Sequence, residues 1–228
     1  LLSSVTAICR MPFLSMVRKA ATISLFDSNV KLIVEELQTQ QIIHQLKEDI
    51  IDAGILATPL SVRGIIERPI FNEPFLAYLS PGHPLLSLDK VSDKDLSMDD
   101  IWLLNEGHCF RDQAIEVCKR IRGHNPLRKN LVFESGNLKT LKRLVDQKFG
   151  YTLIPWLATI GIPAAEKKKK IRAFKAPIPT REVSIVYSRS FLKKSIIDAL
   201  YKNIVSSLPK ELKHSKTKER VVEMPSFK

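Results

Sequence analysis

Two cysteines, Cys109 and Cys118, lie nine positions apart and are the residues of this sequence best suited to chemistry. They belong to the stretch GHCFRDQAIEVC, in which His108, Arg111 and Asp112 add polar and charged side chains. A cysteine thiolate attacks a peroxide to give a sulfenic acid, and a second thiol converts that acid to a disulfide. The stretch therefore contains the residue types of a redox-active pair.

The helix that the sequence predicts between the two cysteines would keep their sulfur atoms apart. Apolar side chains at Phe110, Ala114 and Val117 predict a helix over residues 110–121. Nine residues of α-helix rise about 13 Å and complete about two and a half turns, which places the sulfurs on opposite sides. A disulfide needs Cα atoms within about 7 Å, so the pair cannot bond while the helix is intact. Disulfide formation would require the segment to unwind, which makes the pair a candidate conformational switch.

The neighbours of Cys109 favour a reactive thiol. Unsatisfied N–H groups at a helix N-terminus and the cation of Arg111 both stabilise a thiolate. His108 has a side chain that can donate a hydrogen bond to a peroxide oxygen. Free cysteines are also among the most buried residue types, so two inert core cysteines are the competing interpretation.

Hydrophobic periodicity predicts an open α/β sheet. Residues 31–57 read as strand, helix and strand, with Thr39 as the helix N-cap. The apolar stripe of this helix consists of Ile42, Ile43, Leu46 and Ile50. Other expected strands are 2–7, 75–79, 101–104, 131–133, 151–154 and 183–187, and other expected helices are 12–24, 110–121, 138–148 and 191–206.

This order of elements predicts two Rossmann-like subdomains joined by two crossovers with a cleft between them, as in type II periplasmic-binding-protein-like folds. Subdomain I takes residues 1–68 and 190–209. Subdomain II takes residues 69–189 and carries the cysteine pair. Residues 210–228 are expected to form a flexible tail.

Composition excludes several classes of protein. The 228 residues carry a net charge of +12, but the lysines concentrate in a run at 167–170 and in the tail, without interleaved aromatic residues to stack on bases. We interpret the lysine run as a solvated loop and the tail as a frayed terminus. No CxxC pair or histidine cluster is present, so neither a metal nor any other cofactor is expected. Without a membrane-length apolar run or a signal peptide, the sequence favours a cytoplasmic location.

The segment GHCFRDQ closely resembles the sensing segment of the OxyR-type peroxide sensors, a family within the LysR-type transcriptional regulators. The stretches QTQQIIHQL, DAGILA, NEPFLAYLSPGHP and YTLIP resemble the wider LysR-type effector domain, over residues 2–208. The resemblance implies that hydrogen peroxide oxidises Cys109, that Cys118 resolves the product as a disulfide, and that the chain is a sensor and not an enzyme.

The same resemblance implies a peroxide pocket. Its expected members are His108, Thr39, Asp112, Arg111 and Cys9. At the end of the first strand the family has a threonine, which corresponds here either to Cys9 or to Thr6. The family's arginine after the VY of the penultimate strand is replaced by Ser188, which lowers the expected stabilisation of the Cys109 thiolate.

The partners implied by the family are a second copy of the chain, in a homodimer that becomes a tetramer in the full-length protein, and RNA polymerase. DNA would be bound only through an N-terminal winged helix-turn-helix, which we do not find in this sequence. A thiol reductant such as glutaredoxin or thioredoxin would reset the switch, and no membrane contact is expected.

Three other functions compete with the peroxide sensor. A LysR-type sensor of a small metabolite would bind its ligand in the cleft near Thr39, Ser135 and Asn137, and its cysteines would be incidental. A thiol peroxidase would use similar chemistry. Peroxidases of that class resemble a thioredoxin fold, whereas the order of elements here predicts two subdomains. A periplasmic solute-binding protein would share the fold and would require a signal peptide.

Overall fold

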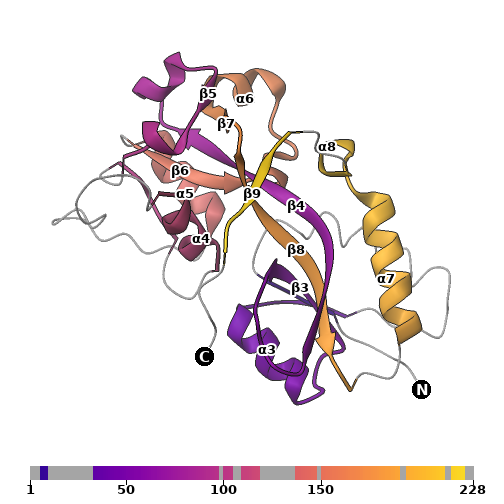
Figure 1. Ribbon diagram of the computed structural model, residues 1–228. Helices are drawn as coiled ribbons and strands as arrows, with labels where there is room; N and C mark the ends of the chain where they lie inside the picture. The colour runs from indigo at the N-terminus through magenta and orange to yellow at the C-terminus, as the bar shows by residue number, and fades with distance from the viewer. Residues whose placement is uncertain are drawn as a thin grey trace. The chain divides into compact units, whose positions relative to one another are not determined.

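Figure 1 shows the computed structural model of the chain, which describes residues 6–9, 33–97, 100–104, 109–118, 137–147, 150–190, 194–213 and 217–223. The chain divides into two compact units. Unit 1 comprises Leu1–Asn72, Glu182–Ser215 and Met224–Lys228, and unit 2 comprises Glu73–Arg181 and Lys216–Glu223. The chain passes between the units inside two strands, β4 (Ile65–Leu79) and β8 (Ile178–Ser188), and again at each end of the segment Lys216–Glu223. The boundaries predicted from the sequence follow residues 68 and 189.

Unit 1 contains the parallel sheet that the sequence predicts. Strand β1 (Thr6–Cys9) pairs in parallel with both β2 (Val34–Leu37) and β3 (Ala53–Thr58). Strand β3 also pairs antiparallel with the second half of β8. Every residue of β3 is buried, as expected for a strand covered on both faces. The α/β architecture is therefore confirmed, while the predicted helix over residues 12–24 lies outside the described residues.

Helix α3 (Thr39–Lys47) connects β2 to β3 and corrects two details of the prediction. Its N-cap is Gln38, whose backbone N–H donates to Oε1 of Gln41 at 2.9 Å, so Thr39 is the first helical residue instead of the cap. Ile42 and Leu46 are fully buried, but Ile50 lies beyond the helix and is 60% exposed. The predicted apolar stripe of this helix wrongly includes Ile50, because apolar periodicity does not mark where a helix ends.

Two helices follow β8 in unit 1. Helix α7 (Lys194–Ser207) buries Ile197, Leu200 and Ile204, which confirms an amphipathic helix in this part of the chain. Residues 191–193, at the predicted start of the helix, lie outside the described residues. A short helix, α8 (Lys210–Lys213), then buries Leu212, within the range in which we expected a flexible tail.

Unit 2 is built around the second half of β4. This strand pairs antiparallel with β6 (Tyr151–Pro155) and β7 (Ile171–Phe174), and β7 pairs in parallel with β5 (Lys90–Val91). In the described part of this unit, the α-helices are α4 (Cys109–Cys118), α5 (Leu138–Gln147) and α6 (Ala164–Lys170), and the short 3-10 helices are η1 (Pro84–Ser87), η2 (Asp93–Asp95) and η3 (Trp156–Thr159).

Helix α5 is flanked by Asn137 and, three residues after its last described position, by Gly150. The side chain of Asn137 accepts a hydrogen bond from the N–H of Lys139 at 2.8 Å, which is the geometry of an N-cap. Gly150 follows with φ of +110°, and a Cβ there would lie 2.3 Å from the carbonyl oxygen of Asp100. Glycine is therefore required between α5 and β6.

Three other segments of unit 2 differ from expectation. Residues 101–104 do not form a strand, since only Ile101 pairs, in an isolated bridge to Tyr151. The lysine run at 167–170 is the second half of α6 and not a loop. Strand β9 (Glu219–Val221), within the range of the expected flexible tail, pairs in parallel with the first residues of β8.

Candidate functional site

Helix α4 contains both cysteines of the pair and confirms the predicted helix as far as residue 118, where the described segment ends. The buried side of α4 consists of Cys109, Phe110, Gln113, Ala114, Val117 and Cys118. At 100° per residue, Cys109 and Cys118 lie about 180° apart around the helix axis and about 13 Å apart along it. Both are free thiols, and each lies at one edge of the buried side of the helix.

The first turn of α4 packs on the sheet of unit 2. Cys109 is 4% exposed, and the ring of Phe110 stacks on that of Phe75 in β4, with 5.2 Å between the ring centroids. The guanidinium carbon of Arg181 lies 5.4 Å from the centroid of the Phe110 ring, within the range of a cation–π contact. Aromatic and cationic contacts therefore position the residue that follows Cys109.

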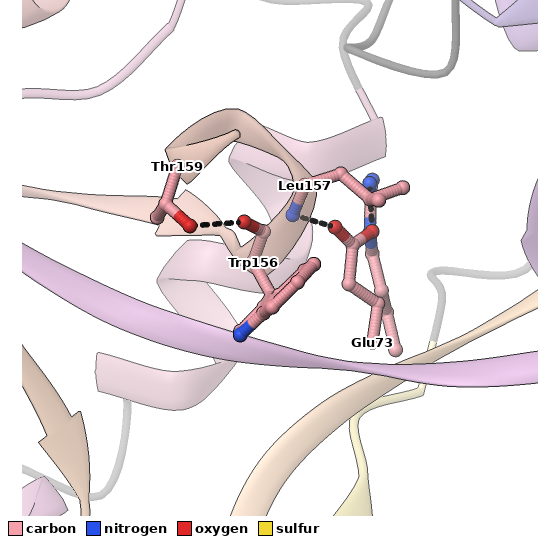
Figure 2. A network of polar contacts seen from close by, with 5 residues as sticks. Glu73, Trp156, Leu157 and Thr159 are labelled. Atoms are coloured by element: carbon pink, nitrogen blue, oxygen red, sulfur yellow. Dashed lines mark hydrogen bonds and ion pairs between the residues drawn. The ribbon is translucent and has the colours of Figure 1, made fainter. Parts of the chain in front are cut away.

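Beneath this contact lies a buried ion pair between Glu73 and Arg181. Their side chains are 0% and 1% exposed, and two guanidinium nitrogens of Arg181 donate to Oε2 of Glu73 at 2.9 and 2.5 Å. The other carboxylate oxygen accepts a hydrogen bond from the backbone N–H of Leu157 at 2.7 Å (Figure 2). A charged pair this deeply buried depends on such hydrogen bonds for its stability. The network joins β4, η3 and β8 directly under α4.

At the other end of α4, Cys118 is fully buried against Tyr151 of β6. The sulfur lies 3.9 Å from the phenolic oxygen, and the phenol donates a hydrogen bond to the carbonyl oxygen of Ser97 at 3.0 Å. Burial raises the pKa of the Cys118 thiol to about 12. The hydrogen bond with Tyr151 opposes this shift, and the negative charge of Asp93 adds to it. Cys118 is therefore a protonated thiol, shielded from solvent.

Gln113 connects the middle of α4 to the C-terminal part of the chain. Its side chain is 0% exposed, and its amide nitrogen donates to the carbonyl oxygen of Val222 at 3.3 Å. Val222 directly follows β9 and is itself buried at 1% exposure.

The structure places the predicted pocket residues as follows. Arg111 and Asp112 lie on the outer side of α4, with 3.7 Å between guanidinium nitrogen and carboxylate oxygen. Thr39 and Cys9 belong to unit 1, where Thr39 is buried at 2% exposure. Cys9 and Leu37 are partners at the ends of two parallel strands, so Cys9 and Thr39 come from the same edge of the sheet. His108 lies outside the described residues.

Ser188, which we predicted to stand at the position of the family's arginine, ends β8. Its hydroxyl forms a hydrogen bond with that of Ser190 at 2.8 Å. A serine hydroxyl carries no charge, so it cannot supply the electrostatic stabilisation of a thiolate that an arginine provides.

Four contributors to the site were not identified from the sequence: Tyr151, Gln113, and the pair Glu73 and Arg181. Gln113 has a usable signal, since it is a polar residue within the apolar stripe of α4. Tyr151 has none, because a tyrosine at the start of a buried strand is usual. Glu73 and Arg181 are 108 positions apart, and no local pattern pairs them.

Two further observations concern metal sites and membrane-spanning helices in the described part of the chain. It contains no group of three or more histidine, cysteine or acidic residues that could hold a metal ion. Within the same ranges, no helix has the length and apolarity to cross a membrane.

The sequence of this chain is similar to a known protein family and to several curated proteins. A family model described as the LysR substrate binding domain matches residues 26–206. The chain is 34% identical over 157 residues to a probable hydrogen peroxide-inducible genes activator of Mycobacterium avium, covering 69% of this chain and 49% of that protein. It is 29% identical over 203 residues to the hydrogen peroxide-inducible genes activator of Haemophilus influenzae, covering 89% of this chain and 63% of that protein.

Among solved structures, the crystal structure of OxyR from Porphyromonas gingivalis is similar, with a TM-score of 0.84 and 24% identity. The alignment covers 97% of this chain and 100% of that one. The chain thus has the fold of that protein, and it spans 49% and 63% of the lengths of the two curated relatives.

Proposed function

Because the chain belongs to the LysR substrate-binding domain family, we propose that it is the hydrogen-peroxide-sensing regulatory part of a DNA-binding transcriptional regulator. The observation that carries the proposal is the placement of two free, buried cysteines at opposite ends of one helix. The similarity to hydrogen peroxide-inducible activators supports the same oxidant.

The proposed reaction has two steps. The Cys109 thiolate attacks one oxygen of hydrogen peroxide, the O–O bond breaks, and the leaving hydroxide takes up a proton to become water. Cys109 is left as a sulfenic acid. The sulfur of Cys118 then attacks that of Cys109, the S–O bond breaks, and a second water leaves with the thiol proton of Cys118. Two thiols lose two electrons in total, and one peroxide is reduced to two waters.

The structural change follows from the distance between the thiols. Sulfurs about 13 Å apart along α4 cannot bond until the helix opens, because a disulfide needs Cα atoms within about 7 Å. Cys118 must also leave its buried position beside Tyr151, where its raised pKa keeps it protonated. The switch is therefore the opening of α4, and the disulfide holds it open.

The pocket residues have distinct proposed roles. The helix N-terminus stabilises the Cys109 thiolate, and Arg111 adds positive charge while paired with Asp112. His108 and Thr39 donate hydrogen bonds to the peroxide. Cys9, the last residue of β1, is the remaining residue that we propose for the pocket. Because Ser188 stands where the family has an arginine, we expect slower oxidation of Cys109 than an arginine would give.

In the cell, this part would form a homodimer, and the full-length protein a tetramer that binds DNA through an N-terminal winged helix-turn-helix and acts on RNA polymerase. Its place of action would be the cytoplasm, and glutaredoxin or thioredoxin would reduce the disulfide. The chain would act once per oxidation event and not turn over peroxide as an enzyme does.

The test is mass spectrometry of the reduced protein after one equivalent of hydrogen peroxide. The expected product has lost two hydrogens and contains a cross-link between Cys109 and Cys118. Cys109→Ser should abolish the reaction, and Cys118→Ser should stop it at a sulfenic acid that dimedone traps. An unmodified chain would instead favour a metabolite sensor, and a disulfide that persists in Cys109→Ser, through Cys9, would contradict the assignment of the sensing thiol.

A further inference from the structure

Several contacts hold the C-terminal strand β9 against the rest of unit 2. It runs parallel to the first residues of β8, where the N–H of Ile178 donates to the carbonyl of Lys218 at 2.9 Å and the N–H of Val222 donates to that of Thr180 at 2.7 Å. Arg220 forms an ion pair with Asp93 of η2 at 2.7 Å. The strand is therefore held at both ends and by a side chain in the middle.

From this position β9 reaches α4 (Figure 1). The fully buried amide of Gln113, four residues after Cys109 and five before Cys118, donates to the carbonyl oxygen of Val222. A bond at this place joins the C-terminal strand to the segment that must unwind before the two thiols can meet. Unwinding of α4 at Gln113 would move this amide away from Val222.

A glutamine at this position is a poor choice for helix stability alone. Within the described residues, Oε1 of Gln113 has no hydrogen-bond partner, and a buried acceptor without a partner is destabilising. A leucine would fill the same place in the apolar stripe without that penalty. What the glutamine adds is the bond to Val222.

We propose that β9 is a latch on the redox helix, and that Gln113 is the positioning residue through which the latch acts. The latch binds the helical form of α4 and not the opened form, so it stabilises the reduced state and slows disulfide closure. Conversely, disulfide formation breaks the bond to Val222 and releases β9 from α4. This inference rests on the proposed peroxide-sensing function.

The first test separates the two chemical steps in the full chain. Sulfenic acid formation is measured by dimedone trapping in a Cys118→Ser background. Disulfide closure is measured by rapid acid quench and alkylation in protein that retains both cysteines, at a peroxide concentration that makes the first step fast. Gln113→Leu removes the bond to Val222 and the cost of the unpartnered Oε1 together, so the bond is isolated by a double variant. Arg220→Gln should speed closure in the wild type and have a much smaller effect in the Gln113→Leu background, and neither change should alter the first step.

One further variant completes this experiment. Gln45→Leu is the matched control, because Gln45 is also a helical glutamine with a buried Oε1 that has no partner among the described residues, but it lies in α3 of unit 1. It should change neither rate. Arg220→Gln acts on the latch because it removes the ion pair to Asp93 without touching α4. Unchanged closure in Arg220→Gln, an equal effect of Arg220→Gln in both backgrounds, or equal changes in both steps would overturn the latch.

The second test follows β9 itself. Trypsin cleaves after Lys218 and Arg220, which are protected in the reduced form while β9 is paired with β8. Oxidation removes the bond between Gln113 and Val222, which is one of the contacts that hold the end of β9 in place, so β9 should separate from β8 more often and cleavage at both sites should increase. If mass spectrometry finds the disulfide but cleavage does not increase, the latch is wrong and the peroxide sensor stands. If no disulfide forms, the proposed function fails and the latch fails with it.

Discussion

The buried pair of Glu73 and Arg181 offers a quantitative test of how α4 is held in place. Arg181→Met keeps the length of the side chain but leaves the carboxylate of Glu73 buried without its cation, and Glu73→Gln leaves the guanidinium without its anion. Both side chains are at most 1% exposed, so solvent cannot compensate either charge. Removing one partner of a buried pair costs about 3–5 kcal/mol of unfolding free energy.

Urea unfolding followed by tryptophan fluorescence measures this loss. Both tryptophans of the chain, Trp102 and Trp156, belong to unit 2, so the signal reports on the unit that contains the pair. With a slope of about 2 kcal/mol per molar urea, a loss of about 4 kcal/mol lowers the unfolding midpoint by about 2 M. The double variant should lose much less than the sum of the single losses, because neither charge is then left alone.

A matched control comes from the exposed pairs of the same unit. Lys170 contacts Asp146 at 2.9 Å and Glu166 at 3.2 Å, with all three side chains between 24% and 44% exposed. Lys170→Met should therefore lower the unfolding free energy by less than about 1 kcal/mol. If Arg181→Met gave a shift as small as this control, the pair would be solvated in solution, and the argument that it anchors the start of α4 would be refuted.

Two other predictions concern the far end of α4 and the connection before β6. Because burial raises the pKa of Cys118 from 9.0 to about 12, the folded state keeps a proton that the unfolded state loses, so the unfolding free energy should fall as pH rises from about 9 to about 12. Cys118→Ala should lessen this fall in urea titrations made across that range, and an identical slope in both proteins would contradict the burial argument. Gly150→Ala should lower the urea midpoint of unit 2, since its Cβ would meet the carbonyl of Asp100 at a φ of +110°. A midpoint within error of the wild type would show that the loop shifts without cost.

Predictions from local sequence patterns were correct where the structure depends on a single helix or strand. The stripe of Phe110, Ala114 and Val117 predicted a helix between the two cysteines, and the helix is present. The same argument failed at Ile50, which continues the apolar spacing of α3 but is exposed after the helix has ended. Spacing shows which side of a helix is apolar, whereas the last residue depends on capping and on where the next strand must begin.

The C-terminal range shows a different limit of sequence reasoning. A basic, apolar-poor segment after residue 209 is typical of a frayed terminus. In unit 2, however, β8 offers β9 backbone partners, Asp93 offers a carboxylate to Arg220, and α4 offers Gln113 to Val222. Each of these partners is distant in sequence, so no local sequence pattern predicts the short strand β9.

By itself, the sequence determined the separation of the two thiols, because nine residues and the rise of an α-helix fix it without reference to the rest of the chain. It also determined the α/β class, through the alternation of strand and helix patterns. Only the tertiary structure decided what surrounds the thiols: the phenol of Tyr151 beside Cys118, the Glu73 and Arg181 pair beneath Phe110, and β9 against Gln113. These contacts join residues 33, 71 and 109 positions apart, at places where any compatible side chain satisfies the local pattern, so only the folded chain selects the partners.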